Sequence, residues 1–171
     1  MSDEDPLAPH TVLPVEPVPL IAETFDRGQV TEVRHSVSGC AAAAGLRGQR
    51  LDDFVLAVNE LITNAVRHGG GRGWLRLWHE AGTVYCEVSD AGVGFDSVEH
   101  ESGQRPEPGT AGGWGLWLAR QLSDEMRVLT GAAGTTVRVG TAIEQPAPER
   151  LATEAAGGLV GQPEPDGLAA G

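Results

Sequence analysis

The sequence predicts an α+β fold: a two-layer α/β sandwich in which helices cover one face of a mixed, mostly antiparallel sheet. The first observation is the 3.6-residue apolar period of residues 31–44 and 51–68, which end at Gly45 and Gly69. The second is a change to the two-residue period of strands directly afterwards. The third is a further helical segment followed by a second strand pair. The predicted order is therefore strand, two helices, hairpin, loop, helix, hairpin.

Each strand follows from its local pattern. Residues 18–25 read as a first strand ahead of the two helices. Side chains alternate in residues 73–79 and 83–89, and Ala81-Gly82 between them suits the tight turn of an antiparallel hairpin. The remaining expected elements are a third helix over residues 115–123 and closing strands over residues 127–130 and 135–140.

One folded domain of residues 18–141 is expected between two tails. The 171-residue chain is 40% hydrophobic, enough for a sizeable core. Residues 1–17 are acidic and Pro-rich, and residues 142–171 are rich in Ala, Gly, Pro and Glu, so both are expected to be disordered. Residues 96–111 have no apolar period, which predicts a long loop of the kind that forms lids.

The charge distribution excludes several functions. Each tail carries a net charge of −4, so together they hold −8 of the chain's −12. No basic stripe is visible in the sequence, which disfavours direct binding of nucleic acid. All 12 basic residues are arginine, and a standard P-loop needs a lysine. A P-loop nucleotide site is therefore excluded.

The cysteines and the hydropathy pattern indicate a cytoplasmic protein. Cys40 and Cys86 have no C-x-x-C spacing and are expected to be buried, reduced thiols. We find neither a signal peptide nor an apolar run of membrane length, so a membrane partner is not expected.

The second helix carries an unusual polar arc in the stretch N-E-L-I-T-N-A-V-R-H-G, residues 59–69. At about 100° per residue, Glu60, Asn64 and Arg67 fall within a narrow arc of the helix. Solvent exposure of an amphipathic helix would explain these polar groups, and so would a ligand. The apolar residues that fall elsewhere on the wheel are Phe54, Val58, Leu61, Ile62 and Ala65.

A second cluster, S-D-A-G-V-G-F, follows the end of a strand at residues 89–95. The carboxylate of Asp90 can accept a hydrogen bond from an exocyclic amine. Gly92 and Gly94 lack the Cβ atoms that would block a flat ring from the backbone. Taken alone, D-x-G-x-G also fits an ordinary turn after a strand.

Two further clusters are weaker by themselves. G-G-W-G-L, residues 112–116, precedes a helix, where free N–H groups and the helix dipole favour phosphate. A flexible loop-to-helix junction would have the same composition. G-T-T, residues 134–136, places a hydroxyl near the sheet, although a plain hairpin explains this stretch better.

Taken in order, E-L-I-T-N-A-V-R-H, D-A-G-V-G-F, G-G-W-G-L and G-T-T resemble the asparagine box, the two glycine boxes and the closing threonine of the Bergerat-fold (GHKL) ATPases. That superfamily includes gyrase, a class of heat-shock chaperones, histidine kinases and the anti-sigma-factor serine kinases. The resemblance covers residues 18–141. Four motifs in the right order are far more specific than any one of them.

The resemblance implies a site for ATP and Mg²⁺. Asn64 would hold the metal ion, and Glu60, one helical turn earlier, would be the general base that deprotonates the attacking hydroxyl. Asp90 would read adenine through its exocyclic amine. Gly92 and Gly94 would line the base.

The remaining cofactor-binding residues are implied less directly. Gly113 and Gly115 resemble the glycines that lead from the lid into the helix and approach the phosphates. Thr135 would contribute a hydroxyl near the base. Arg67 or His68 would touch phosphate oxygens, or would simply be solvated.

Within the superfamily, the chain resembles the stand-alone anti-sigma-factor serine/threonine protein kinases. Its length leaves no room for the extra domains expected of gyrase or the chaperones, and His35 lacks the surroundings of a histidine-kinase phosphoacceptor. The resemblance implies phosphorylation of an anti-anti-sigma antagonist, binding of a sigma factor, and a homodimer. A non-catalytic ATP-binding module that sequesters a partner is the alternative, which an intact Glu60 disfavours.

An aromatic surface is predicted on the sheet face opposite the helices, from Trp74, Trp78 and Tyr85. Such an apolar patch suits a dimer or partner interface. Partial cover by the N-terminal strand or by a tail explains it equally well.

Overall fold

The computed structural model describes residues 16–94, 105–106 and 113–144 of the chain. Most of both predicted tails, and nearly all of the predicted lid loop, lie outside these residues. The elements, in chain order, are β1 (Ile21–Asp26), α1 (Val30–Ala44), α2 (Gly48–His68), β2 (Arg72–Glu80), β3 (Thr83–Asp90), α4 (Trp114–Gln121), β4 (Glu125–Gly131) and β5 (Gly134–Ala142).

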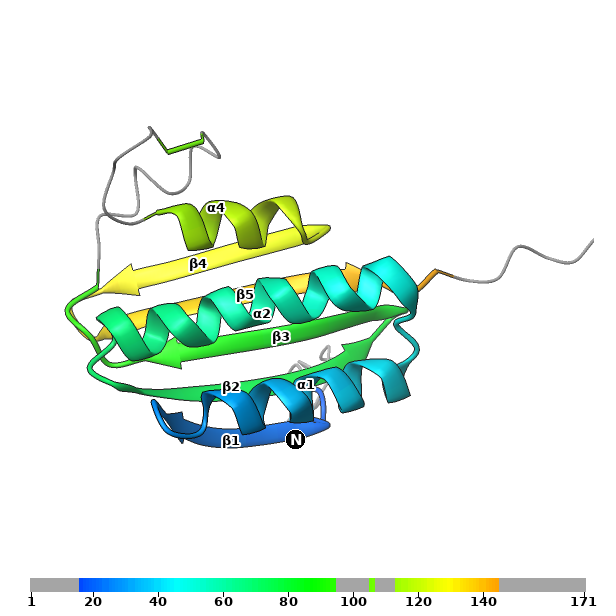
Figure 1. Cartoon of the computed structure of the whole chain (residues 1–171), viewed down its shortest axis with the longest axis horizontal. Coiled ribbons are helices and arrows are strands. Elements are labelled where there is room, and N and C mark those ends of the chain that lie inside the picture. The colour runs from blue at the N-terminus through cyan, green and yellow to red at the C-terminus, as the bar shows by residue number, and fades with distance from the viewer. Residues whose placement is uncertain (1–15, 95–104, 107–112, 145–171) are drawn as a thin grey trace, which may run out of the picture.

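The predicted two-layer architecture is confirmed. A five-stranded sheet has the strand order β1-β2-β3-β5-β4, and α1, α2 and α4 lie on one of its faces (Figure 1). The sheet was expected to be mixed and mostly antiparallel, and all four strand pairs in the described residues are antiparallel. The opposite face, called the open face below, is not covered by a helix of the described residues.

The first strand begins later than predicted, because prolines precede it. β1 begins at Ile21 rather than residue 18, because Pro17 and Pro19 have no N–H group to donate to a ladder. The β2–β3 turn is the predicted one: Ala81 and Gly82 both have positive φ, 48° and 79°. This left-handed pair matches the twist of the flanking strands.

The core lies between the sheet and the helices. α2 lies over the middle of the sheet and runs nearly along its strands, and its five predicted apolar positions are all buried. α4 packs beside α2 and buries Leu116 and Ala119. The polar arc of α2 therefore turns away from the sheet, toward the neighbourhood of α4, because the apolar stripe is held by the core.

The two cysteines differ in burial. Cys86 is fully buried in β3, and this burial raises the pKa of its thiol far above the usual range, whereas Cys40 of α1 is half-buried. We expect a thiol reagent at neutral pH to modify Cys40 and to leave Cys86 unmodified until the protein unfolds. Counting modified thiols by mass spectrometry, with and without denaturant, checks this; equal labelling of both in the native state would contradict it.

No helix in the described part of the chain is long and apolar enough to cross a membrane.

Candidate active site

Glu60 and Asn64 lie on α2 where it faces the start of α4. Both side chains are half-buried, one helical turn apart. A Cβ atom built on Gly115 would lie 2.9 Å from Glu60 Oε2 and 3.1 Å from Asn64 Nδ2. The structure thus brings together three residues that are up to 55 positions apart in the sequence. Gly115 leaves the small space between them open.

The N-terminus of α4 points its free backbone donors at this space. Its N-cap, Gly113, has φ of 83°, and no side chain of the described residues caps the helix. The first N–H to bond within the helix is that of Trp117, to the carbonyl of Gly113. The N–H groups of the first turn remain available, and the helix dipole makes this end positive. An anionic ligand such as phosphate is therefore favoured here.

Asp90, the last residue of β3, is held in one orientation by backbone donors. Its Oδ1 accepts a hydrogen bond from the N–H of Gly92 at 2.9 Å and a longer one from the N–H of Thr135 at 3.3 Å. Among the described residues, no group donates to its Oδ2. A half-buried carboxylate oxygen with no donor is suited to accept a hydrogen bond from a ligand amine.

Glycines allow the chain to pass closely around Asp90. A Cβ on Gly69 would lie 2.2 Å from the Cβ of Asp90, and one on Gly134 would lie 1.9 Å from its carbonyl oxygen. A Cβ on Gly92 would lie 2.5 Å from the carbonyl oxygen of His68. Only glycine fits at these approaches. At this edge of the fold, around Asp90, the end of α2 consequently meets the end of β3 and the start of β5.

Two threonines and Gly94 complete this edge. Thr135 is buried at the start of β5, and its hydroxyl lies 3.2 Å from the hydroxyl of Thr130 at the end of β4. Gly94 has φ of 71°, and a Cβ there would lie 2.9 Å from Thr130 Oγ1. The predicted base-reading residues thus cluster around the carboxylate of Asp90.

Arg67 and His68 are placed differently from the other predicted residues. Both side chains are exposed in the last turn of α2, and among the described residues neither has a hydrogen bond or ion pair to Glu60 or Asn64. His68 does lie at the site, but through its carbonyl oxygen beside Gly92. Their contact with phosphate stays a prediction.

The residues present fit a magnesium ion only together with a nucleotide. The described part of the chain has no group of three or more His, Cys, Asp or Glu side chains that could hold a metal. Asn64 supplies one amide oxygen, and Mg²⁺ commonly takes one or two protein ligands with waters and phosphate oxygens. The open space at Gly115 is where such phosphates would have to lie.

Sequence reasoning missed the role of Gly69 and Gly134 in enclosing Asp90. The sequence predicts Gly69 only as the end of a helix, and Gly134 only as the first residue of the G-T-T motif. The available signal was the placement of each glycine next to a motif residue, His68 and Thr135. Close approach across elements, however, cannot be seen from local sequence.

Gly115→Ala is expected to separate stability from activity. The methyl group would displace Glu60 or Asn64, and a misplacement of about 1 Å can cost roughly 10²-fold in rate. The same change should stabilise the fold by about 0.5–1 kcal/mol, because alanine is the better helix former. Thermal unfolding and phosphoryl-transfer assays measure both effects.

Gly39→Ala provides the matched control for this prediction. Gly39 also lies in a helix, α1, and a Cβ there would meet no described atom within 4 Å. It should therefore stabilise the protein and leave the activity unchanged. Equal activity of both variants would contradict the crowding at Gly115.

Comparison with known proteins places this geometry in a family. Residues 24–141 match the family described as "Histidine kinase-like ATPase domain". The serine-protein kinase RsbW of Listeria innocua is 32% identical over 107 residues, covering 56% of this chain and 68% of that protein. The serine-protein kinase RsbW of Bacillus subtilis is 30% identical over 108 residues, with coverage of 56% and 68%.

A solved structure agrees with the sequence relatives. The crystal structure of the RsbU and RsbW domains of Rv1364c from Mycobacterium tuberculosis is 25% identical, with a TM-score of 0.53. The match covers 74% of this chain and 32% of that one. The chain therefore belongs to the histidine kinase-like ATPase family, and within it to the relatives of the serine-protein kinase RsbW.

Proposed function

We propose that the protein is an ATP-dependent serine/threonine protein kinase of the cytoplasm that acts as an anti-sigma factor. It phosphorylates an anti-anti-sigma antagonist protein and binds a sigma factor. The observation that carries this proposal is the convergence of Glu60 and Asn64 on Gly115 at the N-terminus of α4. A base and an amide oxygen next to a phosphate-binding helix end are the parts that phosphoryl transfer needs.

ATP would bind along one edge of the fold. Asp90 accepts a hydrogen bond from the adenine amine through Oδ2, while Gly92 and Thr135 hold its Oδ1 in place. The phosphates lie against the first turn of α4, where N–H groups are free. Asn64 would hold Mg²⁺, and the positive charge of the ion would stabilise the transferring phosphoryl group.

Glu60 would act as the general base. The carboxylate takes the proton from the serine or threonine hydroxyl of the substrate as that oxygen attacks the γ-phosphorus. The new P–O bond forms while the bond to the β,γ-bridging oxygen breaks, and ADP leaves. Gly115 has no side chain, so the γ-phosphate of ATP can approach both Glu60 and Asn64.

The test is transfer of label from γ-labelled ATP, with Mg²⁺, into fractionated lysate of the source cell. Wild type is run beside Glu60→Gln. A small protein labelled on serine or threonine by wild type alone would support the kinase and identify its substrate. Nucleotide binding with no transfer in any fraction would instead support a non-catalytic ATP-binding module that sequesters a regulatory partner.

A further inference from the structure

The open face carries a row of charged side chains that crosses four strands. The register places Arg76 of β2 beside Glu87 of β3, Glu87 beside Arg138 of β5, and Arg138 beside Arg127 of β4. Three guanidinium groups thus share the row with one carboxylate. A positive row is notable in a chain whose net charge is −12.

Most of the row is organised around Glu87. This carboxylate, 14% exposed, accepts hydrogen bonds from Nε of Arg76 at 2.9 Å and from Nη2 of Arg138 at 2.7 Å. Both guanidiniums lie over the ring of Trp78, at 5.2 and 5.0 Å from its centroid. Glu87 and Trp78 together therefore position both guanidinium groups. Arg127 is exposed and has no ion pair within the described part of the chain.

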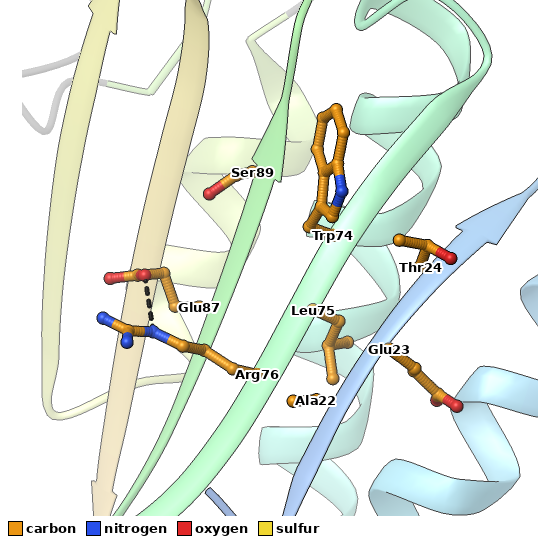
Figure 2. Close-up of a pocket in the computed structure, with 8 residues that line it drawn as sticks. All are labelled: Ala22, Glu23, Thr24, Trp74, Leu75, Arg76, Glu87 and Ser89. Carbon is orange, nitrogen blue, oxygen red and sulfur yellow. Dashed lines mark hydrogen bonds and ion pairs between the residues drawn. The ribbon is translucent and has the colours of Figure 1, made fainter. Parts of the chain in front are cut away.

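The open face is also hollowed beside this row. A groove of about 630 Å³ lies along β1, β2 and β3, and a smaller one of about 170 Å³ continues over β5 and β4. Figure 2 shows the first groove, with the Arg76–Glu87 pair on one side and Trp74 above it. Trp74 is 48% exposed and Leu129 is 73% exposed. The face thus offers apolar contacts as well as positive charge.

The beginning of the described chain already contacts this row. Glu16 lies 3.5 Å from Nη1 of Arg76, whereas Leu20, four residues later, donates its N–H to Leu77 at the sheet edge. The described chain therefore begins on the open face, at Glu16. Residues 1–15 contain three acids, Asp3, Glu4 and Asp5, and neither lysine nor arginine.

We propose that residues 1–15 of this chain bind across the open face, with the carboxylates of Asp3, Glu4 and Asp5 pairing with Arg138 and Arg127. Fifteen extended residues reach about 50 Å, and three strand spacings amount to roughly 15 Å. Attachment through Glu16 gives the segment a high effective concentration at the face. A protein partner that uses the open face then has to displace this segment.

The test uses a spin label on the full-length chain. Ser2→Cys provides the labelling site, and Cys40→Ser removes the accessible native thiol while Cys86 stays buried. We expect strong loss of the backbone amide signals of Arg138 and Arg127 in ¹⁵N spectra, and no loss in α1. Replacing the three acids by lysine, Asp3→Lys, Glu4→Lys and Asp5→Lys, should restore these signals. The matched control reverses Glu154, Glu164 and Asp166 in the other tail and should change nothing.

Two results would overturn the proposal. Signal loss that persists after reversal of the three acids would show mere tethering near Arg76 rather than binding. The second result comes from a mixture of spin-labelled chain at natural isotope abundance and ¹⁵N-enriched chain without a spin label. Signal loss in that mixture would place the segment on a second copy instead. Neither measurement involves ATP or phosphoryl transfer, so each is independent of the proposed kinase activity.

Discussion

Glu60→Gln is expected to lower the rate of phosphoryl transfer by about 10²–10⁴-fold, the usual contribution of a general base. Glutamine keeps the size and polarity of the side chain beside Gly115 but cannot take a proton. ATP affinity should be unchanged or slightly higher, because the substitution removes a negative charge near the phosphates. Single-turnover transfer to the identified substrate, and calorimetric titration with ATP, measure the two quantities separately.

Glu32→Gln is the matched control for this variant. Glu32 is an exposed glutamate in the first turn of α1, so the same chemical change there should leave the transfer rate intact. A Glu60→Gln protein that transfers phosphate at the wild-type rate would exclude Glu60 as the base. The sequestering module would then become the better account of the site.

Asp90→Asn is expected to weaken ATP binding by roughly 10–150-fold, corresponding to the 1.5–3 kcal/mol of a hydrogen bond to a charged group. The asparagine oxygen can keep the bonds from Gly92 and Thr135 at the Oδ1 position. The amide nitrogen then takes the place of Oδ2. Because this nitrogen and the adenine amine are both hydrogen-bond donors, no hydrogen bond can form between them. The fold should survive, since the backbone contacts around residue 90 are unaltered.

Inosine triphosphate makes this prediction specific to base recognition. Its carbonyl oxygen replaces the adenine amine, so it offers an acceptor to the asparagine amide. We expect the variant to lose its preference for ATP over inosine triphosphate, measured as the ratio of the two Kd values. An equal loss of affinity for both nucleotides would indicate damage to the site rather than a changed hydrogen bond.

The local elements could be predicted because each depends on nearby residues. Gly69 ends α2 where the apolar period stops, and Ala81-Gly82 makes the β2–β3 turn through two positive φ angles. The errors concern a few residues at element ends, as at β1, where Pro19 prevents earlier pairing. The polar arc with Glu60 and Asn64 was also visible, since helical spacing places both on one side.

Other features arise only where distant segments meet. The space bounded by Glu60, Asn64 and Gly115 requires α4 to pack against α2, and the enclosure of Asp90 requires Gly69 and Gly134 to approach it from two elements. Burial of Trp78, 3% exposed although it lies on the open face, likewise depends on arginines from two other positions in the sheet.

The sequence by itself therefore determined the fold class, the order of the elements and the identity of the chemical groups, because periodicity, turns and caps are properties of neighbouring residues. Only the tertiary structure decided which groups face one another. Arg76, Arg127 and Arg138 are scattered in the sequence and read as isolated surface charges. Strand register aligns them in one positive row around Glu87, since register depends on long-range pairing that no local pattern specifies.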